Sequence, residues 1–108
     1  MMAMYPHTIT RWRLSEDGRK ASWERSTIAR CRWSETGGYS EGTGGDTTSR
    51  AAALILPPSA EPPLARHDRV ALGDVAGDVP SPAALAVTAC RPVFLAGPLP
   101  HHWEASAS

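Results

Sequence analysis

The stretch that decides the fold is His7–Trp33, which reads HTITRWRLSEDGRKASWERSTIARCRW. Two runs of alternating side chains flank Asp17-Gly18, a dipeptide that tolerates the positive φ angles of a two-residue hairpin turn. A longer loop over residues 15–20 is the alternative, and it keeps the same two antiparallel strands. With Asp17 and Gly18 as the turn, the predicted cross-strand pairs are Leu14 with Ala21, Trp12 with Trp23, Arg11 with Glu24, and Ile9 with Ser26.

The alternation in this hairpin predicts one apolar face and one polar face, because successive side chains of a strand point to opposite sides. A slip by one residue would expose both tryptophans, so the pattern restricts the pairing. The predicted apolar face holds Trp12, Leu14, Ala21, Trp23, Ala29, Cys31 and Trp33. The predicted polar face holds Arg11, Arg13, Ser22, Glu24, Arg30 and Arg32.

Beyond the hairpin the periodicity stops, and residues 35–49 are rich in glycine, serine and threonine. This composition predicts a long mobile loop. The apolar run Ala51–Leu56 follows, and Pro57-Pro58 ends it too soon for a helix, so it is expected to be a buried strand. Residues 57–67 are expected to form a rigid proline-rich connector.

Three further strands are predicted in the last part of the chain, at residues 68–74, 83–91 and 101–107. Their expected inward residues are Val70 and Leu72; Leu85, Val87 and Ala89; and His101, Trp103 and Ala105. About six short strands separated by turn signals indicate an all-β fold. We therefore predict a single domain over residues 1–108, a small antiparallel β-barrel or sandwich with one long flexible Gly-rich loop.

The charge of the chain sums to zero but is unevenly distributed. Residues 11–33 hold seven basic and three acidic side chains, and the remainder holds four basic and eight acidic ones. Opposed patches of this kind suit head-to-tail contacts between copies, although a solvated sheet face of arginines is the alternative. A neutral chain lacks the basic footprint that nucleic-acid binding normally needs. With ten prolines, nine glycines and one phenylalanine the core is expected to be thin, so that neighbouring subunits add stability.

Cys31 and Cys90 show no metal-type or redox-type spacing, and the first residues show no basic start followed by an apolar run. The chain is therefore expected to be cytosolic with reduced, half-buried cysteines. A disulfide between them is the alternative. No run approaches the roughly 20 apolar residues that cross a bilayer, so no membrane partner is expected.

The sequence offers weak candidates for chemistry. His101, His102 and Glu104 are a close group of metal-ligand types, but adjacent histidines on a strand point to opposite faces, so no metal site is expected. Asp68, Asp74 and Asp78 are interpreted as turn residues rather than as a calcium cluster. No nucleophile, phosphate-loop or dinucleotide motif is present. We expect no catalytic residue, no cofactor and no enzymatic activity.

The order of short motifs resembles a known group of proteins. An Ile9-Thr10 strand, a Trp23–Arg25 second strand, an Asp68–Val70 strand and a final strand with Trp103 occur in that order. This pattern is similar to the small minor capsid or head-closure proteins of tailed phages and prophages, and it covers nearly the whole chain. Ser22 stands where threonine is common in that group.

The resemblance implies a β-barrel protomer without catalytic residues that joins copies of itself into a ring beneath the portal. Its implied partners are copies of itself, a portal or adaptor protein, and tail proteins, with packaged DNA nearby but no sequence-specific binding. The implied location is the virion neck, and the host cytoplasm during assembly. A tail-completion or tail-terminator protein, or a small β-barrel protein-binding module, is the alternative function.

In this interpretation the Gly-rich segment forms an assembly interface, ordered by a neighbouring subunit or by projection into the channel of the ring. Its glycines, including Gly37, give reach, Tyr39 gives an anchor, and Ala51–Leu56 fixes the root of the loop. The alternative is an ordinary surface loop. The predicted interface residues are Gly38, Tyr39, Gly42, Gly44, Gly45, Asp46, Arg50 and Leu54.

Overall fold

The computed structural model describes residues 5–17, 20–36, 39–40, 47–48 and 50–108. These residues contain strands and connecting segments and no helix, which confirms the predicted all-β class. The strands are β1 (His7–Asp17), β2 (Lys20–Thr36), β3 (Tyr39–Ser40), β4 (Thr47–Thr48), β5 (Ala51–Leu56), β6 (Arg69–Leu72), β7 (Leu85–Val93) and β8 (His102–Ala107).

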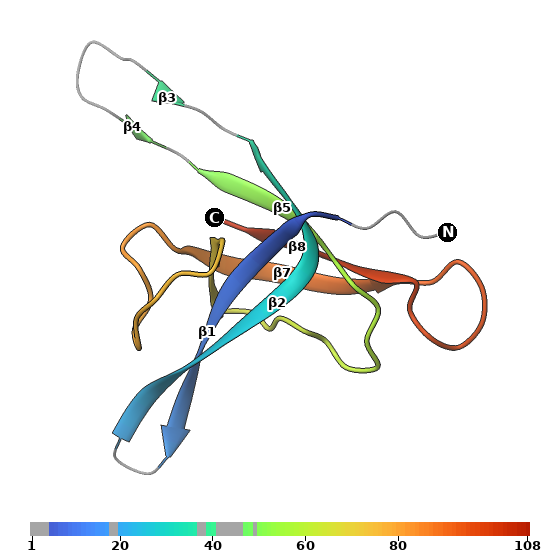
Figure 1. Ribbon diagram of the computed structural model, residues 1–108, viewed down its shortest axis with the longest axis horizontal. Helices are drawn as coiled ribbons and strands as arrows, with labels where there is room; N and C mark the ends of the chain where they lie inside the picture. The colour runs from blue at the N-terminus through green and yellow to red at the C-terminus, as the bar shows by residue number, and fades with distance from the viewer. Residues whose placement is uncertain (1–4, 18–19, 37–38, 41–46, 49) are drawn as a thin grey trace.

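Six of these strands close into an antiparallel barrel in the order β1-β2-β5-β8-β7-β6, and β6 pairs back to β1 (Figure 1). The structure thus selects the barrel over the sandwich. The shortest ladder of the barrel joins β6 to β7, which pair at only two positions. β3 and β4 form a separate two-stranded sheet that extends from the barrel.

β1 and β2 form the predicted hairpin, but in a register that differs by two residues. Asp17 pairs with Lys20, and Trp12 pairs with Arg25 instead of the predicted Trp23. A shift of two residues leaves every side chain on its original face, so alternation permits both registers and only the turn separates them. Asp17 is therefore the last residue of β1 and not part of the turn.

A β-bulge in β2 interrupts this pairing near the open end of the hairpin, away from the turn. Ile9 pairs with Ile28, but His7 pairs with Cys31, so β2 holds one residue more than β1 in this interval. Within it, Arg30 has a φ of 62°, a left-handed conformation that is rare for residues other than glycine. One extra residue reverses the alternation of side chains on either side of it.

The bulge places the two halves of the predicted apolar face on opposite sides of the barrel wall. Cys31 and Trp33 point into the barrel and are buried there. Trp12, Leu14 and Trp23 belong to the outer side of the hairpin, and Leu14 is 44% exposed. The prediction of one continuous apolar face is therefore wrong, because local alternation cannot register an inserted residue.

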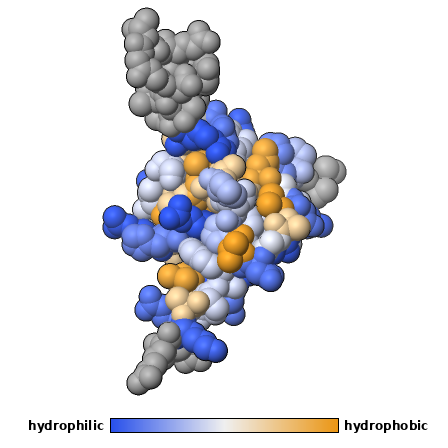
Figure 2. Space-filling model, turned by 90° about the vertical axis from the view of Figure 1, so that its left-hand side faces the viewer, coloured by the Kyte–Doolittle hydropathy of each residue, from blue (hydrophilic) through white to orange (hydrophobic). Residues whose placement is uncertain are grey.

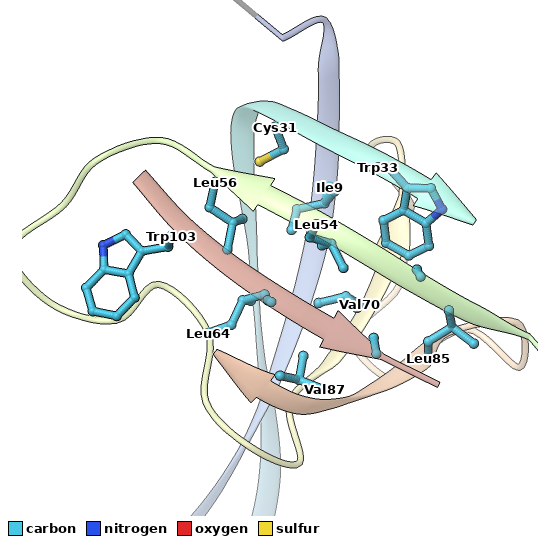
Figure 3. Close-up of a cluster of buried hydrophobic side chains, with 13 residues drawn as sticks. Ile9, Cys31, Trp33, Leu54, Leu56, Leu64, Val70, Leu85, Val87 and Trp103 are labelled. Atoms are coloured by element: carbon cyan, nitrogen blue, oxygen red, sulfur yellow. The ribbon is translucent and has the colours of Figure 1, made fainter. Parts of the chain in front are cut away.

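The barrel interior is filled by aliphatic side chains with a tryptophan at either end (Figure 3). Leu54, Leu56, Val70 and Val87 are each at most 1% exposed. Burial of a side chain of this size contributes about 1.5–3 kcal/mol to the free energy of unfolding. The cluster comprises Ile9, Cys31, Trp33, Ala52, Leu54, Leu56, Leu64, Val70, Leu85, Val87, Trp103, Ala105 and Ala107.

A second bulge, in β7, changes which residues face this interior. Val87 pairs with Ala107 and Ala89 pairs with Ser106, so Thr88 is the extra residue. Val87 is buried as predicted, but Ala89 is exposed and Cys90 packs against the core in its place.

The other inward predictions have mixed outcomes. Val70, Leu85, Trp103 and Ala105 are buried as expected. The predictions for Leu72 and His101 are wrong, because each residue lies at or just before the end of a strand, where the barrel no longer covers its side chain. Leu72, at the end of β6, is 47% exposed, and His101, which precedes β8, is exposed.

The proline-rich connector, residues 57–67, closes one end of the barrel. Leu64 is 1% exposed within the core, and the Nε1 of Trp103 donates a hydrogen bond to the carbonyl of Ser59 at 3.0 Å. On the inner side of β1, Arg11 donates to the carbonyl of Pro63 at 2.8 Å. The connector is thus bound to both β1 and β8.

The outer side of β1 is covered by residues 73–77, which we call the cover segment. Thr10 donates to the carbonyl of Gly73 and accepts from the backbone N–H of Val75 at 2.8 Å. The indole N–H of Trp12 donates to the carbonyl of Gly77 at 3.0 Å. Trp12 and Thr10 are both fully buried, so a small second core lies outside the barrel.

Candidate functional site

The described ends of the Gly-rich segment continue the β2–β5 hairpin beyond the barrel (Figure 1). In every pair along β2–β5 and β3–β4 the residue numbers have the same sum, so the two ladders share one register. We call β3 and β4 the arm. The pairs nearest to it and within it are Thr36 with Ala51, Tyr39 with Thr48, and Ser40 with Thr47.

The segment expected to be a mobile loop, residues 35–49, therefore contains paired strands at its described positions. Glu35 and Thr36 belong to β2, and Tyr39 belongs to β3. Five predicted interface residues lie outside the described residues, namely Gly38, Gly42, Gly44, Gly45 and Asp46, and so does Gly37, which was expected to give the loop reach. Their role stays a prediction.

The root of the arm is held by an ion pair between β2 and the residue that precedes β5. The Nη2 of Arg50 lies 2.7 Å from the Oε1 of Glu35, and its Nη1 donates to the carbonyl of Ala83 at 2.7 Å. The Nε1 of Trp33 also donates to Glu35, at 3.3 Å. The hydrogen bond from Arg50 lowers the pKa of the Glu35 carboxyl, with smaller contributions from the charge of Arg50 and then from the hydrogen bond of Trp33.

Arg50 therefore links the arm to the segment before β7, a role that its sequence position did not indicate. The predicted interface residue Leu54 has a different place, because it is 1% exposed inside the barrel. Its side chain supports β5 from within and is not on the surface of the protomer. β5 does span Ala51–Leu56, as expected.

A groove lies on the outer face of β2, β5, β8 and β7. Its volume is about 620 Å³, within the range of many ligand sites. Two rows of paired residues run across the four strands on this face. One row holds small residues, and the other holds larger and charged residues. The small row is Ser34–Ala53–Ser106–Ala89, and the charged row is Arg32–Ile55–Glu104–Arg91, each residue being paired with its neighbours in the row.

The charged row is only partly neutralised. Arg91 lies 3.3 Å from Glu104, and His102 lies 3.6 Å from the other oxygen of Glu104. Arg32 is exposed and forms no ion pair with any residue in the described ranges. The groove therefore combines a floor of small and apolar side chains with an available guanidinium.

The connection between β7 and β8, residues 94–101, is the most exposed apolar segment of the molecule's described part and lies at the right of Figure 1. Phe94, Leu95 and Leu99 are 53%, 68% and 66% exposed. The loop closes at its base, where the N–H of His101 donates to the carbonyl of Val93 at 2.8 Å. Sequence reasoning missed this surface, although the run Pro92–Pro100 contains no charged residue.

Hydrophobic residues are distributed differently on the opposite side of the barrel. On the face in Figure 2 they lie in several separate patches between hydrophilic residues. Isolated apolar residues are normal on a protein surface, whereas a concentrated group marks an interaction site. The β7–β8 loop is the stronger candidate for contact with another molecule.

The uneven charge of the sequence is partly neutralised within the fold. Arg13 forms an ion pair with the buried Asp68 at 2.9 Å, and Arg25 forms one with Asp74 and also donates to the carbonyl of Val75 at 2.7 Å. Acidic residues from the second half of the chain thus bind arginines of the hairpin. Of the three aspartates considered as a calcium cluster, Asp68 and Asp74 are therefore bound to arginines.

The histidines and cysteines lie as follows. His101 and His102 approach each other at 3.0 Å between their Nδ1 atoms, because His101 precedes the strand and does not follow its alternation. In the described ranges, no three histidine, cysteine, aspartate or glutamate side chains are grouped to hold a metal. Cys31 and Cys90 are free thiols, and burial raises the pKa of both, that of Cys31 to about 12.

A scan of the sequence against family models finds no match, and neither do searches of curated proteins and of solved structures. Within the described part of the chain, no helix has the length and apolar character for a membrane span.

Proposed function

We propose that this chain is a structural protein of a tailed phage or prophage whose copies join into a ring of the head-to-tail connector, beneath the portal. The arm is the observation that carries the proposal, and the sequence resemblance gives the assembly its place in the virion. The proposed partners are further copies, a portal or adaptor protein, and tail proteins. Packaged DNA lies nearby without sequence-specific binding.

The physical reason concerns the stability of a two-stranded ribbon. β3 and β4 pair only with each other among the described residues, whereas β2 and β5 have barrel neighbours on both sides. A two-stranded hairpin alone is marginally stable in water, and a third strand or a packed face stabilises it. A neighbouring subunit that pairs with or packs on the arm would supply that contact.

The root of the arm supports the same proposal, because it is anchored to the barrel by hydrogen bonds. Arg50 binds Glu35 of β2 and the carbonyl of Ala83, so the arm is bonded to a segment outside its own hairpin. β5 lies between β2 and β8 in the closed barrel. The arm therefore continues directly from two strands of the barrel wall.

The test is a variant in which residues 38–49 are replaced by Asn-Gly. The shared register of β2 and β5 then allows Gly37 and Arg50 to pair across a two-residue turn, and the contact of Arg50 with Glu35 is kept. Light scattering and negative-stain microscopy would compare the assembly of the two proteins. Circular dichroism and thermal unfolding would establish that the variant folds.

We expect the full chain to form rings and the variant to remain a folded protomer. A full chain that stays monomeric at all concentrations, with and without portal and tail proteins, would overturn the proposal. Rings formed equally by both proteins would refute the role of the arm.

A small protein-binding module is the second candidate, and it is favoured by the outer groove, where Arg32 has no ion-pair partner among the described residues. In that case the chain stays monomeric and binds an extended peptide along the groove. A tail-completion or tail-terminator protein would also form a ring, and pull-down with purified portal protein against purified tail protein would separate it from a closure protein.

A further inference from the structure

We propose that the β7–β8 loop of one copy inserts into the outer groove of the next copy, so that this contact joins subunits head to tail. The inference rests on the proposed function, because it assigns two surfaces to the assembly of identical chains. It concerns residues far from the arm, and the two contacts can be tested separately.

The loop has the composition of a buried contact but is exposed in the protomer. Phe94, Leu95 and Leu99 each expose more than half of their surface, and no charged residue lies between Pro92 and Pro100. Exposed large apolar side chains gathered on one loop are typical of interaction sites. Removal of each leucine from water would strengthen association about tenfold or more.

The loop is also preorganised to present these side chains. Gly97 has a φ of 81°, which turns the chain between Leu95 and Leu99, and the buried Pro100 fixes the return to β8. The hydrogen bond between His101 and Val93 closes the base. Because this conformation is formed before binding, little conformational entropy is lost on association.

The groove is complementary to such a loop. The outward side chains of its floor are those of Ala53, Ile55 and Ala89, and its volume of about 620 Å³ exceeds that of a single side chain. At its rim, Arg32 lacks an ion-pair partner among the described residues. In the described part of the chain, no backbone N–H donates to the carbonyls of residues 94–99, so these carbonyls are available to that guanidinium.

The position of the two surfaces decides the kind of contact. No residue of the loop lines the groove of its own protomer, since Phe94, Leu95 and Leu99 are exposed and the lining comes from β2, β5, β7 and β8. A contact between two different surfaces of identical chains is heterologous, and it continues from copy to copy until a ring closes. A symmetric pair of loops would instead stop at a dimer.

The test uses two variants that each damage one surface. L95E/L99E places charges on the loop, and A53W fills the centre of the groove. The matched controls are V79E, at a side chain that is 63% exposed on another loop, and A76W, at an exposed alanine outside the groove. All five substitutions are at exposed positions, so the fold is expected to persist, and thermal unfolding verifies this.

We expect each interface variant alone to be monomeric by light scattering and both controls to assemble as the full chain does. The decisive result is the mixture of L95E/L99E with A53W. Each protein retains the surface that the other lacks, so an equimolar mixture should form a one-to-one dimer and nothing larger.

Three outcomes would overturn the inference. If L95E/L99E and A53W assemble as well as the full chain, the contact is elsewhere and the proposed ring stands. If the mixture forms no dimer, the two surfaces do not meet. If the full chain is monomeric but binds vesicles of phosphatidylcholine and phosphatidylglycerol, and L95E/L99E does not, then the loop is a membrane contact, and the proposed ring fails with it.

Discussion

Arg13 binds Asp68 with two hydrogen bonds, from Nε at 3.1 Å and from Nη2 at 2.9 Å, and the Asp68 side chain is buried. The same carboxylate accepts the backbone N–H of Ala65 at 2.9 Å. The pair therefore joins the N-terminal hairpin to the end of the connector, just before β6 begins. The hydrogen bond to Asp68 is also the main reason why the pKa of Arg13 is raised.

Asp68→Asn should destabilise the protein substantially. It removes the negative charge that Asp68 presents to Arg13 and Arg11, and it leaves Arg13 without its bidentate partner. Loss of one member of a buried pair costs about 3–5 kcal/mol, and the partial exposure of Arg13 reduces the expected cost to about 2–3 kcal/mol. Urea unfolding monitored by tryptophan fluorescence measures the change.

Asp74→Asn is the matched control for that variant. Asp74 also pairs with an arginine, but its side chain is 73% exposed, so the pair is screened by water. The expected loss is below about 1 kcal/mol. Similar losses for the two variants would show that burial of Asp68 does not determine the strength of its pair.

The sequence was sufficient to predict the all-β class and most of the strands, but not the choice of barrel over sandwich, because alternation and turn residues are local signals. The hairpin around Asp17, the strand Ala51–Leu56 and the last strand with Trp103 and Ala105 all follow from them. The register of the hairpin could not be predicted in the same way, because pairings that differ by two residues give identical faces.

The bulges and the outer groove could not be predicted from local sequence patterns. Nothing in the residue type of Arg30 signals a left-handed backbone, yet this residue decides that Trp33 is inside the barrel and Trp12 outside it. The outer groove arises where four strands align small residues at one level, and this alignment requires the registers. The apolar loop after β7 did have a signal in the sequence, because no charged residue lies between Pro92 and Pro100.

Arg30→Gly should stabilise the protein, and Arg30→Val should destabilise it. Arg30 has a φ of 62°, a conformation that costs non-glycine residues about 1–2 kcal/mol and a β-branched residue more. Glycine adopts this φ without strain but loses more chain entropy on folding, so a net gain of about 0.5–1 kcal/mol is expected. Thermal unfolding gives the sign directly.

The control for the bulge is Arg32→Val, since Arg32 is exposed in the regular part of β2 beyond the bulge. Valine has a good strand propensity, so this change should be close to neutral. If valine were tolerated equally at both positions, the left-handed backbone at Arg30 would be of no consequence for stability.

Trp12→Ala should cost as much as a core substitution, although Trp12 lies outside the barrel interior. Its side chain is fully buried under the cover segment, and its Nε1 binds the carbonyl of Gly77 at 3.0 Å. Truncation of a buried tryptophan costs about 3–5 kcal/mol. Trp23→Ala, at a partly exposed position of the same hairpin, should cost clearly less in the same urea titration.

Trp12→Phe separates the hydrogen bond from the packing. Most of the apolar contact remains, but the carbonyl of Gly77 loses its donor, and the expected cost is about 1–3 kcal/mol. Amide hydrogen exchange should then increase selectively at residues 73–77. Unchanged exchange in that segment would mean that the indole hydrogen bond does not hold the cover segment in place.

The two thiols should respond differently to alkylation. Burial raises the pKa of Cys31 to about 12, so almost no thiolate forms in the folded chain near pH 8. Cys90 is only partly buried, so its thiol is more accessible to the reagent, although burial raises its pKa as well. Because the thiolate is the reactive form, iodoacetamide should label Cys90 at least about tenfold faster than Cys31. Equal rates, measured by mass spectrometry, would contradict the burial of Cys31.

The same raised pKa makes the stability of the fold depend on alkaline pH. The unfolded thiol titrates near pH 9.0 and the folded one near 12, so the contribution of Cys31 is complete below pH 9 and is lost as the pH rises toward 12. The difference in unfolding free energy between the natural chain and Cys31→Ala should therefore decrease above pH 9. Cys90 is present in both proteins, so its titration cancels in the difference. A difference that stays constant from pH 7 to pH 10.5 would show that Cys31 ionises as easily in the folded chain as in the unfolded one, and the buried position of Cys31 beside Ile9 and Leu56 would then be wrong.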